Sequence, residues 1–345
     1  MVKVAIFGAS GYTGQELTRI LLGHPEAELI AVTSRRFAGR PVAEVFPALY
    51  GLTSLKYQKA TPKEIADASD VVFLALPHGV SLDIAPVFIQ AGKKVIDLSA
   101  DYRLHDVKTY EAWYGKHSSD KILKNAVYGI PEIYRQEIKK SAFIANPGCY
   151  PTSIILGLAP ALKNKLIDVF SIIADSASGA SGAGREPQIG SLFCEVDGGF
   201  KAYKIAQHRH TPEIEQELNL LAGEKFNISF TPHLLPVKRG ILSTIYATLK
   251  KKIDLAELHA LYSSFYAGEK FVRVYPAGSY PNISSVCGSN YCDLGLVLDP
   301  RTNRIIIMAA IDNLIKGAAG QAVQNMNIVC GFAENTGLQN IPLYP

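Results

Sequence analysis

The sequence predicts an α/β protein with a doubly wound, Rossmann-type parallel sheet and a second α+β domain whose sheet is mainly antiparallel. Three observations support this fold class. The chain opens with an apolar strand, a glycine-rich turn and a helical pattern, KVAIFGASGYTGQELTRILL. Strand-like and helix-like segments then alternate to about residue 148, as in parallel sheets. Beyond about residue 225, strand-like segments with hairpin turns dominate.

Length and composition indicate a globular protein with two hydrophobic cores. The 345 residues exceed what one core usually organises, and 48% of them are hydrophobic. No apolar run reaches the roughly 18 residues of a membrane span, and the chain opens in a strand rather than a secretory signal, so we expect a cytoplasmic location. The net charge of +4 arises from 35 basic and 31 acidic residues without long like-charged blocks, which excludes a nucleic-acid or membrane footprint.

The five cysteines predict neither a disulfide framework nor a metal centre. Their number is odd, and their spacing lacks the paired pattern of zinc ligands. We therefore expect no metal site.

The opening turn has the composition of a dinucleotide-binding loop. Glycines let the backbone approach a pyrophosphate closely, while amides at the start of the following helix face the anion. The spacing is GxxGxxG, and hydroxyls lie between the glycines. The candidate cofactor residues of this loop are Gly8, Ser10, Gly11, Tyr12, Thr13 and Gly14.

The end of the second strand favours NADP over NAD. An NAD site usually places an acidic residue there to bind the ribose 2′-hydroxyl, whereas this chain has Ser34, Arg35 and Arg36, which suit a 2′-phosphate. The alternative is that both arginines belong to a solvated loop.

Two further strands are expected to end at the ligand-binding edge of the sheet. DVVFLAL is followed by residues 77–79, and KKVIDLS is followed by residues 99–103. Ligands bind at the carboxyl ends of the strands in open α/β sheets. Pro77 is therefore a candidate cofactor residue and Arg103 a candidate substrate residue.

The segment NPGCYPT, residues 146–152, presents the strongest candidate for a nucleophile. A strand, SAFIAN, leads through a Pro-Gly turn to Cys149, and Pro151 opens a long apolar helix. At a helix N-terminus the helix dipole and backbone amides favour a thiolate, and the same amides can hold an oxyanion. We interpret Cys149 as catalytic and the other four cysteines as structural.

A nucleophilic cysteine needs an acid/base partner, and HRHTPEIEQ supplies candidates. If this segment is extended, His208 and His210 share one face and Arg209 points away. His233 is a weaker candidate. Lys238 and Arg239 are either an anion clamp or surface charges.

The segment between these motifs is expected to be mobile. Residues 175–187, DSASGASGAGREP, consist mainly of small and polar side chains that do not form a core. They either close over the cofactor or connect two elements. The last helix is expected to begin at or near Asp312.

Taken together, these motifs resemble the N-acetyl-gamma-glutamyl-phosphate reductases of arginine biosynthesis, within the superfamily of aspartate-semialdehyde dehydrogenases. The likeness rests on GASGYTG, SRR, NPGCYPT, HRHTPEIEQ and DNLIKGAAGQAVQNMN and covers nearly the whole chain. It implies NADPH-dependent reduction of an acyl phosphate to a semialdehyde, with Cys149 as nucleophile and His210 as acid/base.

The resemblance also implies a domain division, an oligomer and further site residues. An NADP-binding domain would comprise residues 1–148 and 313–345, and a catalytic, substrate-binding and oligomerisation domain residues 149–312. A homodimer or homotetramer is expected. Further candidate residues from these segments are Ser178, Gly179 and Asn313 for the cofactor, and Asn146, His208 and Glu213 for the substrate.

Three alternatives stay open. An N-acetyl-aminoadipyl-phosphate reductase of lysine biosynthesis would share these motifs, because one methylene changes binding by only about 1 to 3 kcal/mol. Aspartate-semialdehyde dehydrogenase uses related chemistry but fits HRHTPEIEQ less well. A non-catalytic NADP-binding regulator would carry an unreactive cysteine.

Overall fold

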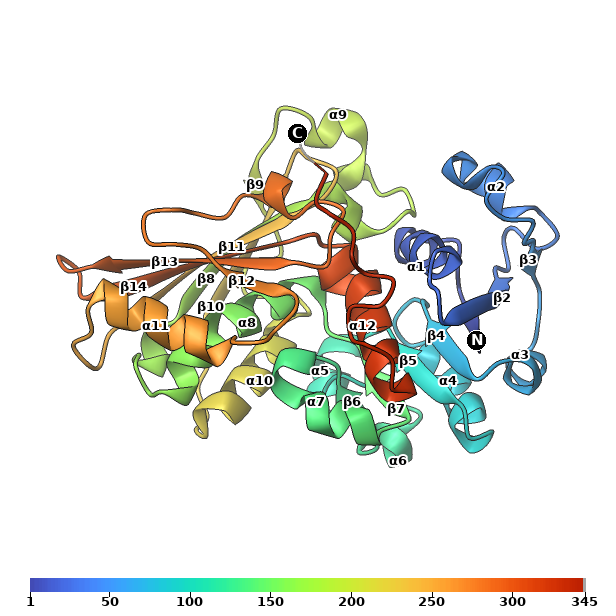
Figure 1. Ribbon diagram of the computed structural model, residues 1–345, viewed down its shortest axis with the longest axis horizontal. Coiled ribbons are helices and arrows are strands. Elements are labelled where there is room, and N and C mark those ends of the chain that lie inside the picture. The colour runs from blue at the N-terminus through green and yellow to red at the C-terminus, as the bar shows by residue number, and fades with distance from the viewer. Residues whose placement is uncertain (344–345) are drawn as a thin grey trace. The chain divides into compact units, whose positions relative to one another are not determined.

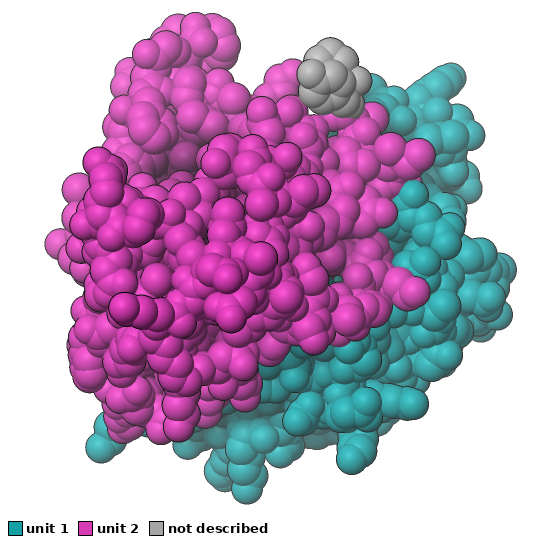
Figure 2. Space-filling view, turned by 60° about the vertical axis from the view of Figure 1, so that its left-hand side comes forward, with its two compact units in different colours: residues 1–147, 318–339 teal, residues 148–317, 340–345 magenta. Residues whose placement is uncertain are grey.

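The computed structural model describes residues 1–343, which form two compact units (Figures 1 and 2). The first unit comprises Met1–Pro147 and Ala318–Gln339, and the second comprises Gly148–Gly317 and the residues from Asn340. The roles expected for the two domains stay predictions. Among the described residues, no helix has the length and apolar character needed to cross a bilayer.

The first unit contains a sheet in which all pairings are parallel. Its order is β3-β2-β1-β4-β5-β7-β6. The strands are β1 (Val2–Phe7), β2 (Ala27–Thr33), β3 (Tyr57–Gln58), β4 (Val71–Leu74), β5 (Lys94–Asp97), β6 (Val127–Tyr128) and β7 (Phe143–Ala145). The chain leaves β1 toward β2 on one side and returns to β4 on the other, so the predicted doubly wound sheet is confirmed and its switch point lies between β1 and β4.

Helices connect and cover these strands. They are α1 (Tyr12–Leu22), α2 (Val42–Val45), α3 (Pro62–Ala68), α4 (Ser81–Gln90), α5 (Val107–Tyr114), α6 (Asp120–Leu123), α7 (Pro131–Lys140) and, from the end of the chain, α12 (Gly320–Cys330). Helix α12 packs against α1 and α7. The first unit is therefore completed by a segment that is distant in sequence.

The second unit contains a mixed sheet of order β12-β13-β14-β11-β8-β10-β9. The strands are β8 (Ile173–Gly179), β9 (Lys201–Ala202), β10 (Ser229–Leu235), β11 (Ile241–Thr248), β12 (Val272–Val274), β13 (Cys292–Asp299) and β14 (Arg304–Ile311). Only the β8–β10 and β12–β13 pairings in this order are parallel, so the mainly antiparallel sheet is confirmed.

The second unit's longest helix, α8 (Cys149–Lys163), is apolar and almost entirely buried. It packs on β11 and β14, and α10 (Thr211–Ala222) and α11 (Leu255–Phe265) pack on it. A shorter helix, α9 (Phe193–Val196), follows β8. The long buried helix thus positions the residue at its first turn, Cys149, with respect to this unit's core.

One expectation about local structure is wrong. Residues 175–179 do not form an irregular connection: they belong to β8, and the hydroxyls of Ser176 on this strand and of Ser153 on α8 each bond the Ser243 hydroxyl on β11 at 2.7 Å. These short side chains pack in the core because their hydroxyls form hydrogen bonds with one another. The last helix was expected to begin at or near Asp312, and it begins with a π-helical turn, Ile315–Ala319, which leads into α12.

Candidate active site

In the first unit, the three glycines of the opening loop meet three different steric requirements. Gly8 has φ +93°, and a Cβ there would lie 2.5 Å from the Ala75 carbonyl oxygen. Gly14 has no room either, because its Cβ would lie 2.6 Å from the Ala9 backbone. Around Gly11, the N-cap of α1, the space is open. This is the division of tasks expected of a pyrophosphate loop: turn, close approach and helix packing.

Hydroxyl groups hold this loop against the end of β2. The Gly8 N–H donates to Thr33 Oγ1 at 3.0 Å, and the Ser34 hydroxyl donates to Ser10 Oγ at 3.0 Å. Ser34 is buried, its N–H donates to the Gln58 carbonyl oxygen of β3 at 3.2 Å, and its hydroxyl accepts the Phe37 N–H at 3.3 Å. Arg35 and Arg36 are exposed, and the Arg36 guanidinium lies 5.3 Å from the centre of the Phe37 ring.

Three further cofactor candidates of this unit are Tyr12, Thr13 and Pro77. Tyr12 and Thr13 begin α1 and are partly exposed, and Pro77 is exposed after β4. Their contact with a cofactor stays a prediction.

Arg103 and Asn146 are buried and support the chain before Pro147. Arg103 Nε donates to the Asn146 carbonyl oxygen at 2.7 Å, and its Nη2 donates to the Leu98 carbonyl oxygen at 2.8 Å. The Asn146 amide donates to the Ala318 carbonyl oxygen and accepts from Asn325, each at 3.1 Å. Their substrate contacts stay predictions, and the observed contacts position the backbone.

A pair of buried carboxylates was not anticipated from the sequence: Asp97 ends β5, and Asp101 follows four residues later. Asp101 accepts hydrogen bonds from the N–H groups of Gly79 and Ser81 and from the Tyr110 hydroxyl. Asp97 accepts from the Ser81 and Ser99 hydroxyls. The pair fixes the two loops, 77–81 and 98–103, that follow β4 and β5.

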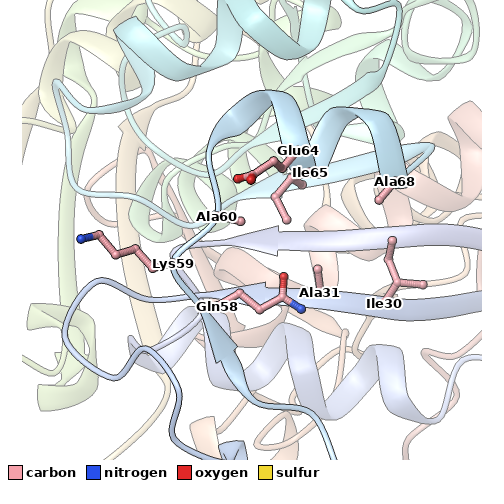
Figure 3. A pocket seen from close by; sticks show the side chains of 8 residues that line it. All are labelled: Ile30, Ala31, Gln58, Lys59, Ala60, Glu64, Ile65 and Ala68. Carbon is pink, nitrogen blue, oxygen red and sulfur yellow. The ribbon is translucent and has the colours of Figure 1, made fainter.

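A cavity of about 390 Å³ lies beside β2 and α3 of the first unit (Figure 3). Ile30 and Ala31 lie on β2, and α3 contributes Glu64, Ile65 and Ala68. None of the predicted site residues lines it.

In the second unit, Cys149 is the first residue of α8, as predicted, with Gly148 as N-cap. Pro151 has no N–H, and the Thr152 N–H donates to the Gly148 carbonyl oxygen at 3.1 Å. The first N–H groups of an α-helix have no acceptor within it, so the N-terminus of α8 favours an anion at Cys149. An oxyanion formed at Cys149 is a suitable acceptor for them.

Glu213 anchors the turn that carries the cysteine. Its Oε1 accepts the Gly148 N–H at 2.7 Å, and its side chain is buried. The role of Glu213 in substrate binding stays a prediction, whereas its observed partner is the N-cap of α8.

The HRH segment is a turn, so the premise of an extended segment is wrong. The Thr211 N–H donates to the His208 carbonyl oxygen at 2.9 Å, and the His210 N–H donates to His208 Nδ1 at 3.1 Å. The turn brings both histidine rings to Tyr150, the neighbour of Cys149, with centroid distances of 5.4 Å for His208 and 5.9 Å for His210.

His208 is held in its neutral form. Burial, followed by the charges of Lys204 and Arg209, lowers the pKa of His208 to about 4. His208 is therefore neutral at pH 7, and because its Nδ1 accepts a hydrogen bond, its proton is on Nε2. Of the pair, His210 is the better acid/base candidate.

Two tyrosine hydroxyls complete the surroundings of the cysteine. The Tyr150 and Tyr203 hydroxyls are 2.9 Å apart. Burial raises the pKa of Tyr203 to about 12, with smaller effects from the Tyr150 hydrogen bond, which lowers it, and the Cys149 charge, which raises it. Burial also raises the pKa of Tyr150, with a contribution from Cys149. Both hydroxyls are therefore protonated at pH 7.

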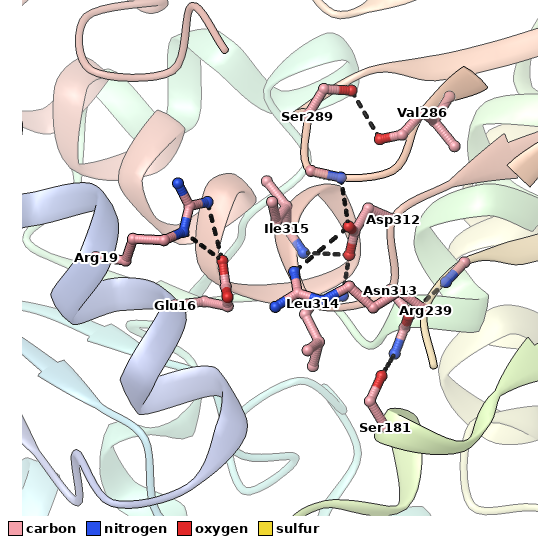
Figure 4. Close-up of polar contacts among 12 residues, drawn as sticks. Glu16, Arg19, Ser181, Arg239, Val286, Ser289, Asp312, Asn313, Leu314 and Ile315 are labelled. Atoms are coloured by element: carbon pink, nitrogen blue, oxygen red, sulfur yellow. Dashed lines mark hydrogen bonds and ion pairs between the residues drawn. The ribbon is translucent and has the colours of Figure 1, made fainter. Parts of the chain in front are cut away.

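Asn313 joins two loops near Ser178 and Gly179. Its Oδ1 accepts the Gly240 N–H at 2.8 Å, and its Nδ2 donates to the Ser181 hydroxyl at 3.0 Å (Figure 4). A Cβ on Gly179 would lie 2.8 Å from the Arg239 backbone nitrogen, so only glycine fits there. The structure gathers these three candidates, and their contact with a cofactor stays a prediction.

Comparison with known proteins places the chain in a family. A protein of Desulfotalea psychrophila described as N-acetyl-gamma-glutamyl-phosphate reductase is 59% identical over 346 residues, covering all of both chains. One of Geotalea daltonii with the same description is 56% identical over the same length. The chain belongs to the N-acetyl-gamma-glutamyl-phosphate reductase family.

Family models and solved structures agree with this membership. Residues 3–141 match the NAD binding domain of semialdehyde dehydrogenases, and residues 149–313 match their dimerisation domain. An aspartate semialdehyde dehydrogenase II of Vibrio cholerae has a TM-score of 0.73 at 16% identity, with 96% of this chain and 98% of that chain covered. A Candida albicans aspartate semialdehyde dehydrogenase solved with NADP has a TM-score of 0.70 at 18% identity, with 97% and 99% covered. The reductase family therefore shares the semialdehyde dehydrogenase fold.

Proposed function

We propose that this chain reduces N-acetyl-gamma-glutamyl phosphate to N-acetyl-glutamate 5-semialdehyde with NADPH and releases phosphate, a step of arginine biosynthesis. The observation that carries this assignment is 59% identity over the full length to a protein with that activity in its description. The placement of Cys149 at the N-terminus of a buried helix supports the chemistry.

The residues of the first unit suit NADP(H). The space around Gly11 at the start of α1 lets a pyrophosphate approach the backbone. The exposed arginines after β2 suit a 2′-phosphate, and the Ser34 that precedes them presents no carboxylate to repel it. When bound, NADPH supplies the hydride for the reduction.

The thiolate of Cys149 begins the reaction by attacking the acyl carbon. The carbon–sulfur bond forms, the carbon–oxygen bond to phosphate breaks, and a thioester remains. A thioester accepts hydride readily because sulfur donates little into its carbonyl. The N–H groups of Cys149 and Tyr150 stabilise the negative oxygen at each tetrahedral stage.

His210 acts as general acid and then as general base in the second stage of the reaction. As hydride adds to the thioester carbon, His210 gives a proton to the oxygen and a thiohemiacetal forms. His210 then takes this proton back, the carbon–sulfur bond breaks, and the aldehyde and the thiolate are released. The neutral His208 maintains the turn through its Nδ1.

The reverse reaction tests the assignment. N-acetyl-glutamate 5-semialdehyde, phosphate and NADP should yield NADPH absorbance only when phosphate is present, and more slowly with the aminoadipate homologue. A preference for the longer compound would move the chain to lysine biosynthesis, and no turnover of either would refute the proposed substrate class.

Replacing Cys149 by Ser should abolish this turnover while NADPH binding, followed by fluorescence, is preserved. The reason is that a serine hydroxyl is a far weaker nucleophile than a thiolate at pH 7. Substantial residual turnover in Cys149→Ser would contradict the thioester mechanism.

Replacing Arg35 by Ala should weaken NADPH binding at least about tenfold and NADH binding less than about twofold, since a charge-assisted bond to phosphate contributes roughly 1.5 to 3 kcal/mol. Titration of both cofactors by fluorescence measures this, with Arg40→Ala as an exposed control farther along the same loop. Equal losses for NADPH and NADH would show that Arg35 does not contact the 2′-phosphate.

We further propose that the chain forms a homodimer or homotetramer. The support is the match of residues 149–313 to a dimerisation domain. Sedimentation velocity distinguishes these assemblies, and a monomer at micromolar concentration would contradict both. The cytoplasmic location stays a prediction.

A further inference from the structure

Gly317 lies directly against the cysteine of the candidate site. A Cβ built on Gly317 would be 2.7 Å from Cys149 Cβ and 3.1 Å from Cys149 Cα. Ordinary van der Waals contact begins at 3.4 Å, so even the methyl group of alanine would be about 0.7 Å too close. Both residues belong to the second unit.

The need for glycine at 317 arises from this contact and not from backbone conformation. Gly317 is not among the residues with positive φ, so its own backbone would accept alanine. What excludes a side chain is the first turn of α8. Glycine at 317 therefore leaves free the space that Cys149 occupies.

Gly317 belongs to a π-helical turn. The Gly317 N–H donates to the Asp312 carbonyl oxygen, five residues earlier, at 2.9 Å, which is the wide spacing of a π turn. Such single turns occur often at functional sites because they displace one residue from the regular helical path.

Asp312 fixes the start of the turn (Figure 4). Its buried carboxylate accepts the N–H groups of Leu314 and Gly288, each at 2.8 Å, and lies 3.5 Å from the Arg239 guanidinium. Because the carboxylate is held from several sides, the turn has little freedom to retreat from a larger residue at 317.

We propose that Gly317 is a positioning residue for the thiol of Cys149. The backbone of the turn holds the cysteine where its sulfur faces the substrate and its N–H group faces the oxyanion. This inference rests on the proposed role of Cys149 as nucleophile. Displacement of a reacting atom by about 1 Å costs on the order of 100-fold in rate, so a shift of the size that alanine requires is costly.

The test compares Gly317→Ala with the parent protein by two measurements. We expect kcat to fall about 10- to 100-fold with KM changed less than about threefold. We also expect iodoacetamide to alkylate Cys149 at least about fivefold more slowly at pH 7, with a higher pH midpoint, because the thiolate loses part of its support from the helix N-terminus. Mass spectrometry of the Cys149 peptide follows the alkylation.

Gly157→Ala is the matched control. Gly157 lies in the same helix, and its Cβ would meet Ile245 Cδ1 at 3.1 Å and Ile307 Cγ2 at 3.3 Å, which strains helix packing without touching Cys149. We expect it to lower Tm with less than about a threefold change in kcat and in alkylation. Equal effects of the two variants, or parental kcat and alkylation in Gly317→Ala, would overturn the proposal.

A second variant covers the case in which Gly317→Ala does not fold. Asp312→Asn weakens the hold on the turn without adding volume, and it should slow alkylation in the same direction but by less. Parental alkylation in Asp312→Asn would then overturn the proposal. Cys149→Ser separates this proposal from the proposed function. Retained turnover in Cys149→Ser would refute the role of Cys149 as nucleophile, whereas alkylation of the glycine variants measures how position 317 affects the Cys149 thiol.

Discussion

At Asp97, burial and a neighbouring carboxylate act in the same direction. The side chain ends β5, is fully buried and accepts hydrogen bonds from Ser81 and Ser99. Burial, and then the charge of Asp101, raise its pKa to about 6 despite these bonds. The folded protein thus carries an aspartate that binds its proton more tightly than an unfolded chain does.

Replacing Asp97 by Asn should therefore remove a pH dependence of stability. Because the folded pKa of about 6 lies above the ordinary aspartate value of 3.8, the stabilisation from protonated Asp97 is complete below pH 3.8 and is lost as pH rises through 6. Relative to the parent, Asp97→Asn should gain unfolding free energy between pH 4.5 and 7.5, on the order of 2 kcal/mol.

Urea unfolding at these two pH values measures the gain. Asp106→Asn is a suitable control, because Asp106 is an exposed helix cap with a lowered pKa. An unchanged difference between parent and Asp97→Asn at both pH values would contradict the assigned shift.

The sequence predicted those site residues whose function depends on local order. Cys149 was placed correctly because a strand, a Pro-Gly turn and Pro151 together define a helix start. Gly317 was missed because its requirement comes from a residue 168 positions away, which no local pattern reveals. The substrate contact of Arg103 stays a prediction, and no local pattern indicated that its guanidinium donates to the backbone carbonyls of Asn146 and Leu98.

Among the elements, helix α8 contains a backbone carbonyl that lacks its helical donor, and a side chain next to another helix supplies a replacement. Pro160 lies inside α8 and has no N–H, so the Leu156 carbonyl lacks its usual donor four residues later. The Tyr266 hydroxyl, which follows α11, donates to this carbonyl, and Tyr262 donates to that of Gly157. The packing of α11 thus satisfies a carbonyl buried in the core.

Tyr266→Phe should destabilise the protein by about 1 to 3 kcal/mol, because it leaves the Leu156 carbonyl buried without that donor. Urea unfolding measures the loss. In a Pro160→Ala background, where the backbone again supplies an N–H, the same substitution should cost less than half as much. Equal costs in both backgrounds would show that the hydroxyl does not replace the missing donor.

Strand β8 shows where composition misleads at this scale. Glycine, serine and alanine at 175–179 predicted mobility, but β11 and β10 pair with the strand on both sides, and the Ser176 hydroxyl bonds the Ser243 hydroxyl on β11. Strand formation depends on such neighbours more than on intrinsic preference. A single sequence does not show which neighbours a segment will have.

For the whole molecule, the fold class followed from alternation and turn chemistry. The parallel sheet and the mixed sheet both appear as predicted, since each strand type leaves a local hydrophobic pattern. The grouping of Ala318–Gln339 with Met1–Pro147 has no such local signal, and it was expected only from the resemblance to a family.

Helix α12 supplies polar groups to the first unit. Gln321 and Asn325 both donate to the Gly129 carbonyl oxygen, at 2.7 and 2.9 Å, and Asn325 also holds Asn146. Gln321, Asn325 and Asn327 are fully buried.

This arrangement has a consequence for synthesis on the ribosome. About 170 residues separate Pro147 from Ala318, so at roughly 5 to 20 residues per second the first unit waits about 10 to 30 s for its last helix. During this interval the Gly129 carbonyl and the Asn146 amide lack their hydrogen-bond partners on α12, and water can form hydrogen bonds with them instead. A nascent chain that exposes hydrated amides during this interval presents less adhesive surface to chaperones and to neighbouring chains than one awaiting a purely apolar helix.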